Sequence, residues 1–130
     1  MNLKQFKRIK NPTEADCLAL ISDQRFSDYE YIPDHFKSSL EFNKKAVKID
    51  YMILDNFEKQ PVELCLAAVT KNGWALEFVK EQTIEICLAA LKNDEHVYVD
   101  VKIVPNPDAR TTIQNLNKLI VADTIKSIPS

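Results

Sequence analysis

Apolar residues recur along this chain with the period of amphipathic helices. The clearest case starts at Pro61 and is followed by apolar residues at i, i+3, i+4 and i+7: Val62, Cys65, Leu66 and Val69. Proline suits the first turn of a helix because its missing N–H would have no partner there. We expect this helix to end near Asn72-Gly73, with Gly73 in the left-handed conformation common at helix ends.

A second, shorter helix is expected to follow the glycine. Between Trp74 and Lys80 the apolar side chains recur at spacings of three and four residues. Thr83 is then a suitable N-cap for the next helix, because its hydroxyl can accept a backbone N–H of the first turn. This predicts a unit made of a helix, a tight turn and a short return helix.

The unit occurs more than once in the chain. Glu63–Val69 reads ELCLAAV and returns as EICLAAL at Glu85–Leu91, which gives a period of 22 residues. Self-similarity at a fixed period of this size is typical of stacked helical units. The sequence therefore predicts an all-α array of short tandem helix-turn-helix repeats within a single domain, 1–130.

Weaker copies extend the repeats over residues 12–103. Cys17 occupies the cysteine position in the first copy, and Asn43 occupies it in the second. These two residues are 26 positions apart, so we expect four inserted residues between them and assign them to Arg25–Asp28.

The segment 96–104 is compatible with two structures. Its sequence, HVYVDVKIV, alternates apolar and polar residues and is rich in β-branched side chains, which favours a strand. The repeat register favours a return helix, which we prefer because no second strong strand pattern could pair with a strand here. From the N-cap Asp108, an amphipathic helix is expected over 108–126 as a cap on the array.

The run from Cys65 to Thr83 resembles the short tandem helical repeats catalogued as the DUF4116 family, and Tyr31–Lys37 is similar to a linker of those repeats. The resemblance implies an all-helical repeat array in bacterial, phage or large-virus proteins, with no assigned activity and no residues of known function. The chain departs from the pattern of these repeats at two places, which predicts that the outer units are less regular. Asn43-Lys44-Lys45 replaces Cys-Leu-Ala, and Asn93-Asp94-Glu95 replaces the Asn-Gly turn.

Composition is that of an ordinary globular domain, with 45% hydrophobic and 28% charged residues among 130. The net charge of −2 provides no overall attraction to nucleic acid or to anionic lipid. Met1–Lys10 lacks the apolar stretch of a signal peptide, and Leu64–Val69 is too short to span a bilayer. We expect a cytoplasmic protein that does not associate with membranes.

The three cysteines point to packing rather than chemistry. An odd number cannot form a closed set of disulfides, and each cysteine lies in an apolar helical run. Cys17, Cys65 and Cys87 are therefore predicted to be small buried side chains. Cys17 and His35 could be imagined as a nucleophile and its base, but we favour a buried thiol and a loop imidazole.

Several kinds of chemistry are excluded by the sequence. Gly73 is the only glycine, whereas Walker A loops and dinucleotide fingerprints need two or more at fixed spacing. The chain also lacks HExxH and CxxC, the spacings of common zinc sites. We therefore expect no catalytic residues, metal or cofactor.

Basic residues form two short clusters. Lys44, Lys45 and Lys48 gather on the atypical second unit, and a second group lies near the amino terminus: Lys4, Lys7, Arg8 and Lys10. The first cluster is a candidate partner-binding patch. The alternative is sequence drift, because the sign of the charge at a solvated helix position can change freely. Nucleic acid is not favoured, because no aromatic residues interleave with the charges as in a base-stacking surface.

Large side chains also recur at one place in the units. Phe26, Met52 and Trp74 occupy equivalent or nearly equivalent positions, and packing between units explains them better than a binding hot spot does.

Two functions remain. The first is a non-enzymatic protein-interaction or scaffold module that presents one surface to a protein partner. The alternative is an inhibitor, encoded by a phage or mobile element, that blocks a host defence nuclease or sensor by steric binding. The alternative rests on the small size, on the lack of catalytic groups and on the genomes that the DUF4116 resemblance implies.

Overall fold

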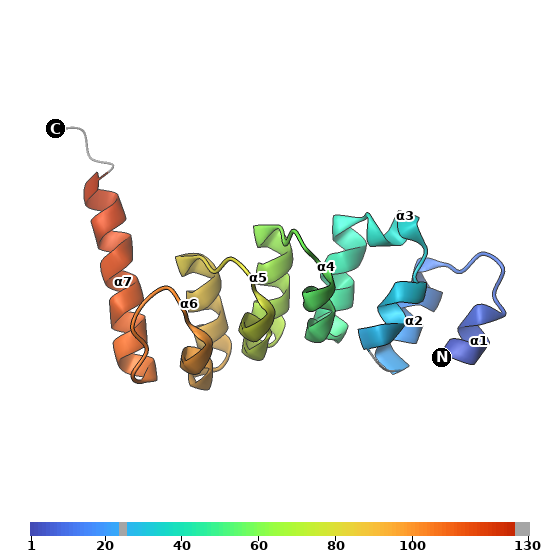
Figure 1. Ribbon diagram of the computed structural model, residues 1–130, viewed down its shortest axis with the longest axis horizontal. Coiled ribbons are helices and arrows are strands. Elements are labelled where there is room, and N and C mark those ends of the chain that lie inside the picture. The colour runs from blue at the N-terminus through green and yellow to red at the C-terminus, as the bar shows by residue number, and fades with distance from the viewer. Residues whose placement is uncertain (24–25, 127–130) are drawn as a thin grey trace.

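The chain folds into a row of helices (Figure 1). The computed structural model describes residues 1–23 and 26–126, and every regular element in these ranges is a helix. The α-helices are α1 (Leu3–Lys7), α2 (Glu14–Asp23), α3 (Asp34–Lys37), α4 (Leu40–Ile49), α5 (Val62–Lys71), α6 (Ile84–Asn93) and α7 (Ala109–Lys126). The 3-10 helices are η1 (Phe26–Tyr31), η2 (Tyr51–Asn56), η3 (Gly73–Phe78) and η4 (Glu95–Asp100). The predicted all-α class is confirmed.

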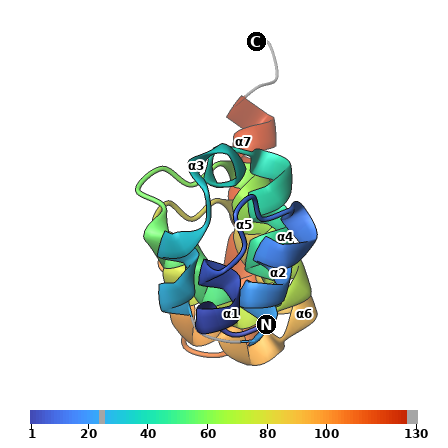
Figure 2. The ribbon, with the colours of Figure 1, turned by 90° about the vertical axis from the view of Figure 1, so that its right-hand side faces the viewer.

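The helices form two layers. Each of α2, α4, α5 and α6 is followed by a 3-10 helix, and these pairs repeat along the row. α4, α5 and α6 begin at Leu40, Val62 and Ile84, so their successive starts are 22 residues apart. Neighbouring α-helices pack against each other, and so do η1 to η4 in order. Viewed along the row in Figure 2, α2, α4, α5 and α6 lie on one side and the 3-10 helices on the other.

The α-helices α2, α4, α5 and α6 each bury the face that meets the rest of the array. In α5 the buried residues are Leu64, Cys65, Ala67, Ala68 and Val69. The predicted apolar stripe is therefore displaced, because Val62 is 45% exposed and Leu66 is only partly buried. α4 and α6 flank α5 and η3 covers it, so its buried face is wide. Periodicity cannot locate the centre of such a face in a helix that is almost wholly apolar.

The predicted helix starts are confirmed. Pro61 directly precedes α5, and the Thr83 hydroxyl accepts the backbone N–H of Ile86 at 3.2 Å at the start of α6. Asp108 Oδ1 accepts the N–H of Thr111 at 2.7 Å at the start of α7. These side chains satisfy N–H groups that have no partner within their own helix.

Gly73 does not have the left-handed conformation predicted for it. Positive φ angles are absent from the described residues, and Gly73 is the first residue of η3. Between the two helices Asn72 is extended, with φ of −147°. A glycine is needed here for space, because an added Cβ would lie 2.5 Å from the carbonyl oxygen of Ala90 in α6.

The ambiguous segment 96–104 is helical in its first part. η4 ends at Asp100, and the part of the chain that the structure describes contains no strand. The helix prediction is thus correct up to Asp100 and wrong for residues 101–104. Val97 and Val101 are buried while Val99 is 54% exposed, so these valines do not share one face as they would in a strand.

The four residues inserted between the first two units were assigned to Arg25–Asp28, and this assignment is wrong for most of them. Residues 32–39 connect η1 to α4, whereas the corresponding connections before α5 and α6 are 57–61 and 79–83. The additional length before α4 forms α3, a single helical turn. Of the predicted segment Arg25–Asp28, Arg25 lies outside the described residues.

Two glutamines fix the connections between units. Gln60 Nε2 donates to the carbonyls of Leu54 and Phe78, both at 2.9 Å, and its Oε1 accepts the N–H of Lys80 at 2.8 Å. One side chain therefore binds the last residues of η2 and η3 together. Such backbone groups need partners wherever water is excluded.

Gln82 repeats this arrangement one unit further along. Its Nε2 donates to the carbonyl of Asp100 at 2.7 Å, and its Oε1 accepts the N–H of Lys102 at 2.8 Å. Asn106 then binds the carbonyls of Tyr98 and Val101, both at 2.9 Å, next to α7.

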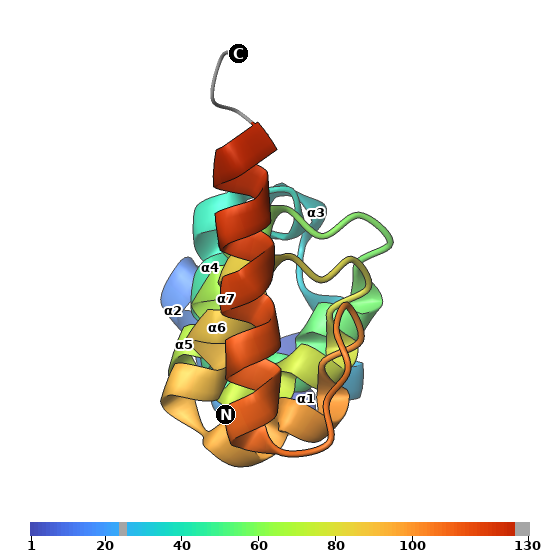
Figure 3. The same ribbon diagram turned by 90° about the vertical axis from the view of Figure 1, so that its left-hand side faces the viewer.

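α7 closes the row at its C-terminal end, where it packs against α6 and η4 (Figure 3). Leu116 and Thr112 are fully buried on one side of the helix, whereas Gln114, Asn117 and Lys118 are exposed. The buried side faces the array, as a terminal element requires, whereas the second half of the helix exposes Leu119, Ile120 and Val121.

Candidate interaction surface

The predicted lysine patch lies on one face of α4. Lys44, Lys45 and Lys48 are separated by three and four residues, the spacing that brings helical side chains to the same face. Lys45 Nζ lies 3.2 Å from both carboxylate oxygens of Glu14 in α2, and Lys44 Nζ lies 3.6 Å from Glu41 Oε1. Lys48 is exposed in the last turn. The lysines share a face, but two of them form ion pairs within the array.

Asn43 does not make the second unit irregular, contrary to the prediction. Its side chain is 5% exposed at the position that Cys65 and Cys87 hold in the next two units. The Tyr29 hydroxyl donates to Asn43 Oδ1 at 2.7 Å, and Asn43 Nδ2 donates to the carbonyl of Lys37 at 2.8 Å. Burial raises the pKa of Tyr29, so this hydroxyl remains a donor. Asn43 thus fills a core position with all its polar groups bonded.

An acidic or amide side chain closes the turn that follows each of α4, α5 and α6. Asp50, Asn72 and Asp94 accept the N–H of the second residue after them, at 3.0, 3.1 and 3.0 Å. This is the local bond that favours Asx residues in turns. Asp94 therefore does in the last unit what Asn72 does in the Asn-Gly turn, and the irregularity predicted for Asn93-Asp94-Glu95 is not present.

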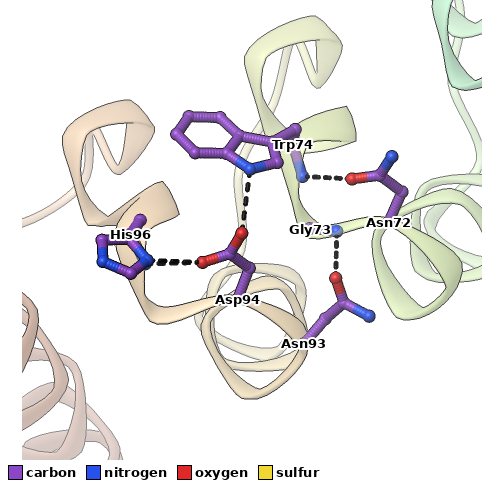
Figure 4. A network of polar contacts seen from close by, with 6 residues as sticks. All are labelled: Asn72, Gly73, Trp74, Asn93, Asp94 and His96. Atoms are coloured by element: carbon purple, nitrogen blue, oxygen red, sulfur yellow. Dashed lines mark hydrogen bonds and ion pairs between the residues drawn. The ribbon is translucent and has the colours of Figure 1, made fainter.

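Asp94 also joins two units (Figure 4). Trp74 Nε1 in η3 donates to Asp94 Oδ2 at 2.9 Å, while His96 Nδ1 lies 3.0 Å from Asp94 Oδ1. Hydrogen bonds from the backbone and side chain of His96 keep the pKa of Asp94 below its usual range, and the bond from Trp74 adds to this. The carboxylate is thus held as an anion that fixes both rings.

Asn93 makes a second contact between the same two units. Its Oδ1 accepts the N–H of Gly73 at 2.7 Å (Figure 4). Its Nδ2 donates to the carbonyl of Thr70 at 3.2 Å. The close approach that requires a glycine at position 73 is therefore made by the end of α6. Trp74 packs between units, as predicted, whereas the side chain of Phe26 lies outside what the structure describes.

The three cysteines are buried and free of disulfides, as predicted. The pKa of each thiol is raised to about 11, chiefly by burial, and for Cys17 the carboxylates of Asp16 and Glu14 contribute to this rise. Cys87 Sγ lies 3.4 Å from Gln82 Oε1, which links the cysteine position to the glutamine contacts. An activated nucleophile needs a lowered pKa, so the raised pKa of Cys17 does not favour its pairing with His35, whose side chain is exposed.

Sequence reasoning missed the most specific contacts of this surface. Trp74, Asp94 and His96 were not predicted to form a network, although Asp94 follows Asn72 by the repeat distance. That spacing was the available signal, because a side chain that closes a turn in one unit has an equivalent in the next. The bond from the indole to the following unit depends on how the units stack.

No family model matches the chain, and no curated protein or solved structure matches it at a significant level. Within residues 1–23 and 26–126, no helix combines the length and apolar character needed to cross a membrane.

Proposed function

We propose that the protein is a non-enzymatic interaction module, a small rigid scaffold that binds a protein partner in the cytoplasm. Stacked helix pairs commonly work in this way, because an array presents an extended surface whose shape is fixed by contacts between neighbours. The DUF4116 resemblance is consistent with such an array and is part of the same proposal.

One observation carries the proposal: the contacts that hold the units together recur, while the outward residues between them change. Gln60 and Gln82 bind equivalent backbone groups in successive units. The face of α4 that carries Lys44, Lys45 and Lys48 does not recur in α5. The equivalent residues there are the partly buried Leu66, the buried Ala67 and the exposed Thr70. A recurring framework with a unit-specific face is what an interaction module needs.

The charge of the α4 face indicates the chemistry of the partner. Lys48 is exposed, and Lys44 keeps 29% of its side chain accessible beside Glu41. We propose that this face binds an acidic protein surface, since complementary charge steers association and fixes orientation.

The α4 face can be tested by charge reversal. Lys44→Glu with Lys48→Glu should weaken capture of the partner from the native host by on the order of 1–3 kcal/mol. Lys45 is left unchanged, because a glutamate there would face Glu14 and disturb the packing of α2 on α4.

The matched control is Lys71→Glu with Lys92→Glu, the same charge change at the ends of α5 and α6. The control should retain the partner, and both variants should have the melting temperature of the unaltered protein within a few degrees. Equal retention by both variants would refute a role for the α4 face.

A further inference from the structure

The 3-10 layer has an outward surface that the lysine patch does not include. In a 3-10 helix, residues three apart lie directly above one another. Each of η2, η3 and η4 therefore exposes one line of two side chains. We call the six residues of these lines the 3-10 ridge: Met52 and Asp55, Trp74 and Glu77, His96 and Val99. The lines stand side by side, because η2 packs on η3 and η3 on η4.

The apolar members of the ridge are accessible. Met52 is 38% exposed, Val99 is 54% exposed, and Trp74 is partly buried. The indole is already held by its bond to Asp94 Oδ2 (Figure 4). A tryptophan that is fixed before binding loses little conformational entropy in a complex, and such residues are frequent anchors of interfaces.

The charges around these residues have one sign. Asp55, Glu77 and Glu95 are exposed, and the segments 51–56, 73–78 and 95–100 contain no lysine or arginine. Asp94 adds a carboxylate whose pKa lies below its usual range. The lysines of these units belong to the α-helices and the connections, as Lys71 does at the end of α5.

We propose that the 3-10 ridge binds a protein segment in which lysine or arginine alternates with apolar residues. A cation of that segment lies against the Trp74 ring and is paired by Glu77 and Glu95, while apolar side chains contact Met52 and Val99. This proposal rests on the function of the protein as an interaction module, and it adds a second surface whose charge is opposite to that of α4.

The ridge can be tested with two synthetic peptides of twelve residues, one alternating lysine with leucine and the other glutamate with leucine. Binding to the full chain is measured by titration calorimetry at low salt. Trp74, the only tryptophan, reports on the ridge by its fluorescence. The lysine peptide should bind and change the fluorescence, and the glutamate peptide should do neither.

Charge-neutralising variants locate the binding. Glu77→Gln with Glu95→Gln should weaken binding of the lysine peptide about 10-fold. Glu63→Gln with Glu85→Gln changes the net charge equally but acts in the first turns of α5 and α6, and it should leave binding unchanged.

The proposal of the ridge would be overturned if the lysine peptide failed to bind, or if both pairs of substitutions weakened its binding equally. Equal binding of the glutamate peptide would also overturn it. A chain that captures its partner through α4 but does not bind the lysine peptide would refute the ridge alone. A chain that binds this peptide through the ridge but captures no partner would refute the α4 face alone.

Discussion

Replacing Gly73 by alanine should destabilise the protein, although the same change is favourable at many helical positions. The added Cβ would lie 2.5 Å from the carbonyl oxygen of Ala90, and 3.3 Å from both Asn93 Oδ1 and Val97 Cγ1. The first neighbour is a backbone atom of α6. It can move away only if α6 shifts relative to α5 or if η3 is displaced.

Two effects of opposite sign determine how much Gly73→Ala changes the free energy of unfolding. The backbone at Gly73 has no positive φ, so alanine there would gain about 0.4–1 kcal/mol, chiefly from the reduced entropy of the unfolded chain. Overpacking of a tightly packed site typically costs about 1–3 kcal/mol. Because the contact is with backbone, overpacking prevails. We expect a net destabilisation of about 1–2 kcal/mol and a melting temperature lower by roughly 3–8 °C.

Urea unfolding, followed by circular dichroism and by Trp74 fluorescence, measures this difference. Glu95→Ala is the control, because Glu95 is the first residue of η4 as Gly73 is of η3, and its side chain is exposed. The control should change stability by less than about 0.5 kcal/mol. A Gly73→Ala protein as stable as the unaltered protein, or more stable, would show that the contact with α6 does not require a glycine.

Three further predictions concern the framework of the array. Gln60→Leu should lower the free energy of unfolding in urea by about 1–3 kcal/mol, because three backbone groups lose their partner, and an unchanged value would refute this role. Thiol reagents at neutral pH should label Cys65 and Cys87 slowly, since burial raises the pKa of each to about 11; rapid labelling would contradict the burial. Asp94 has a lowered pKa, chiefly through the backbone N–H of His96, so it stabilises the fold above its unfolded pKa and this stabilisation is lost as pH falls through the folded value. Asp94→Asn should preserve the turn and reduce the loss of stability below about pH 4, and an unaltered pH profile would exclude this linkage.

Local contacts made several features predictable from the sequence. The N-caps Thr83 and Asp108 were identified because a cap depends on residues within one turn of it. Burial of Cys65 and Cys87 followed from their place in apolar helical runs. The all-α class followed from a helical period that outweighed the β-branched residues near Val99.

The lysine patch was predictable only as a group on one face. Spacings of three and four placed Lys44, Lys45 and Lys48 together on α4. That Lys45 pairs with Glu14 depends on the separation of α2 and α4, which are distant in sequence. Helical periodicity fixes which side chains share a face, but it does not define what the neighbouring helix places opposite them.

The sequence by itself determined the helical class, the caps Thr83 and Asp108, and the turns after α5 and α6, because these depend on backbone propensity and on side chains a few residues away. Only the tertiary structure decided why residue 73 must be glycine, since the constraint comes from Ala90 in the next unit rather than from φ. The bond from Trp74 to Asp94 likewise exists because stacking brings residues 20 positions apart within 2.9 Å. Packing between units sets these distances, and it depends on the summed shape of many side chains.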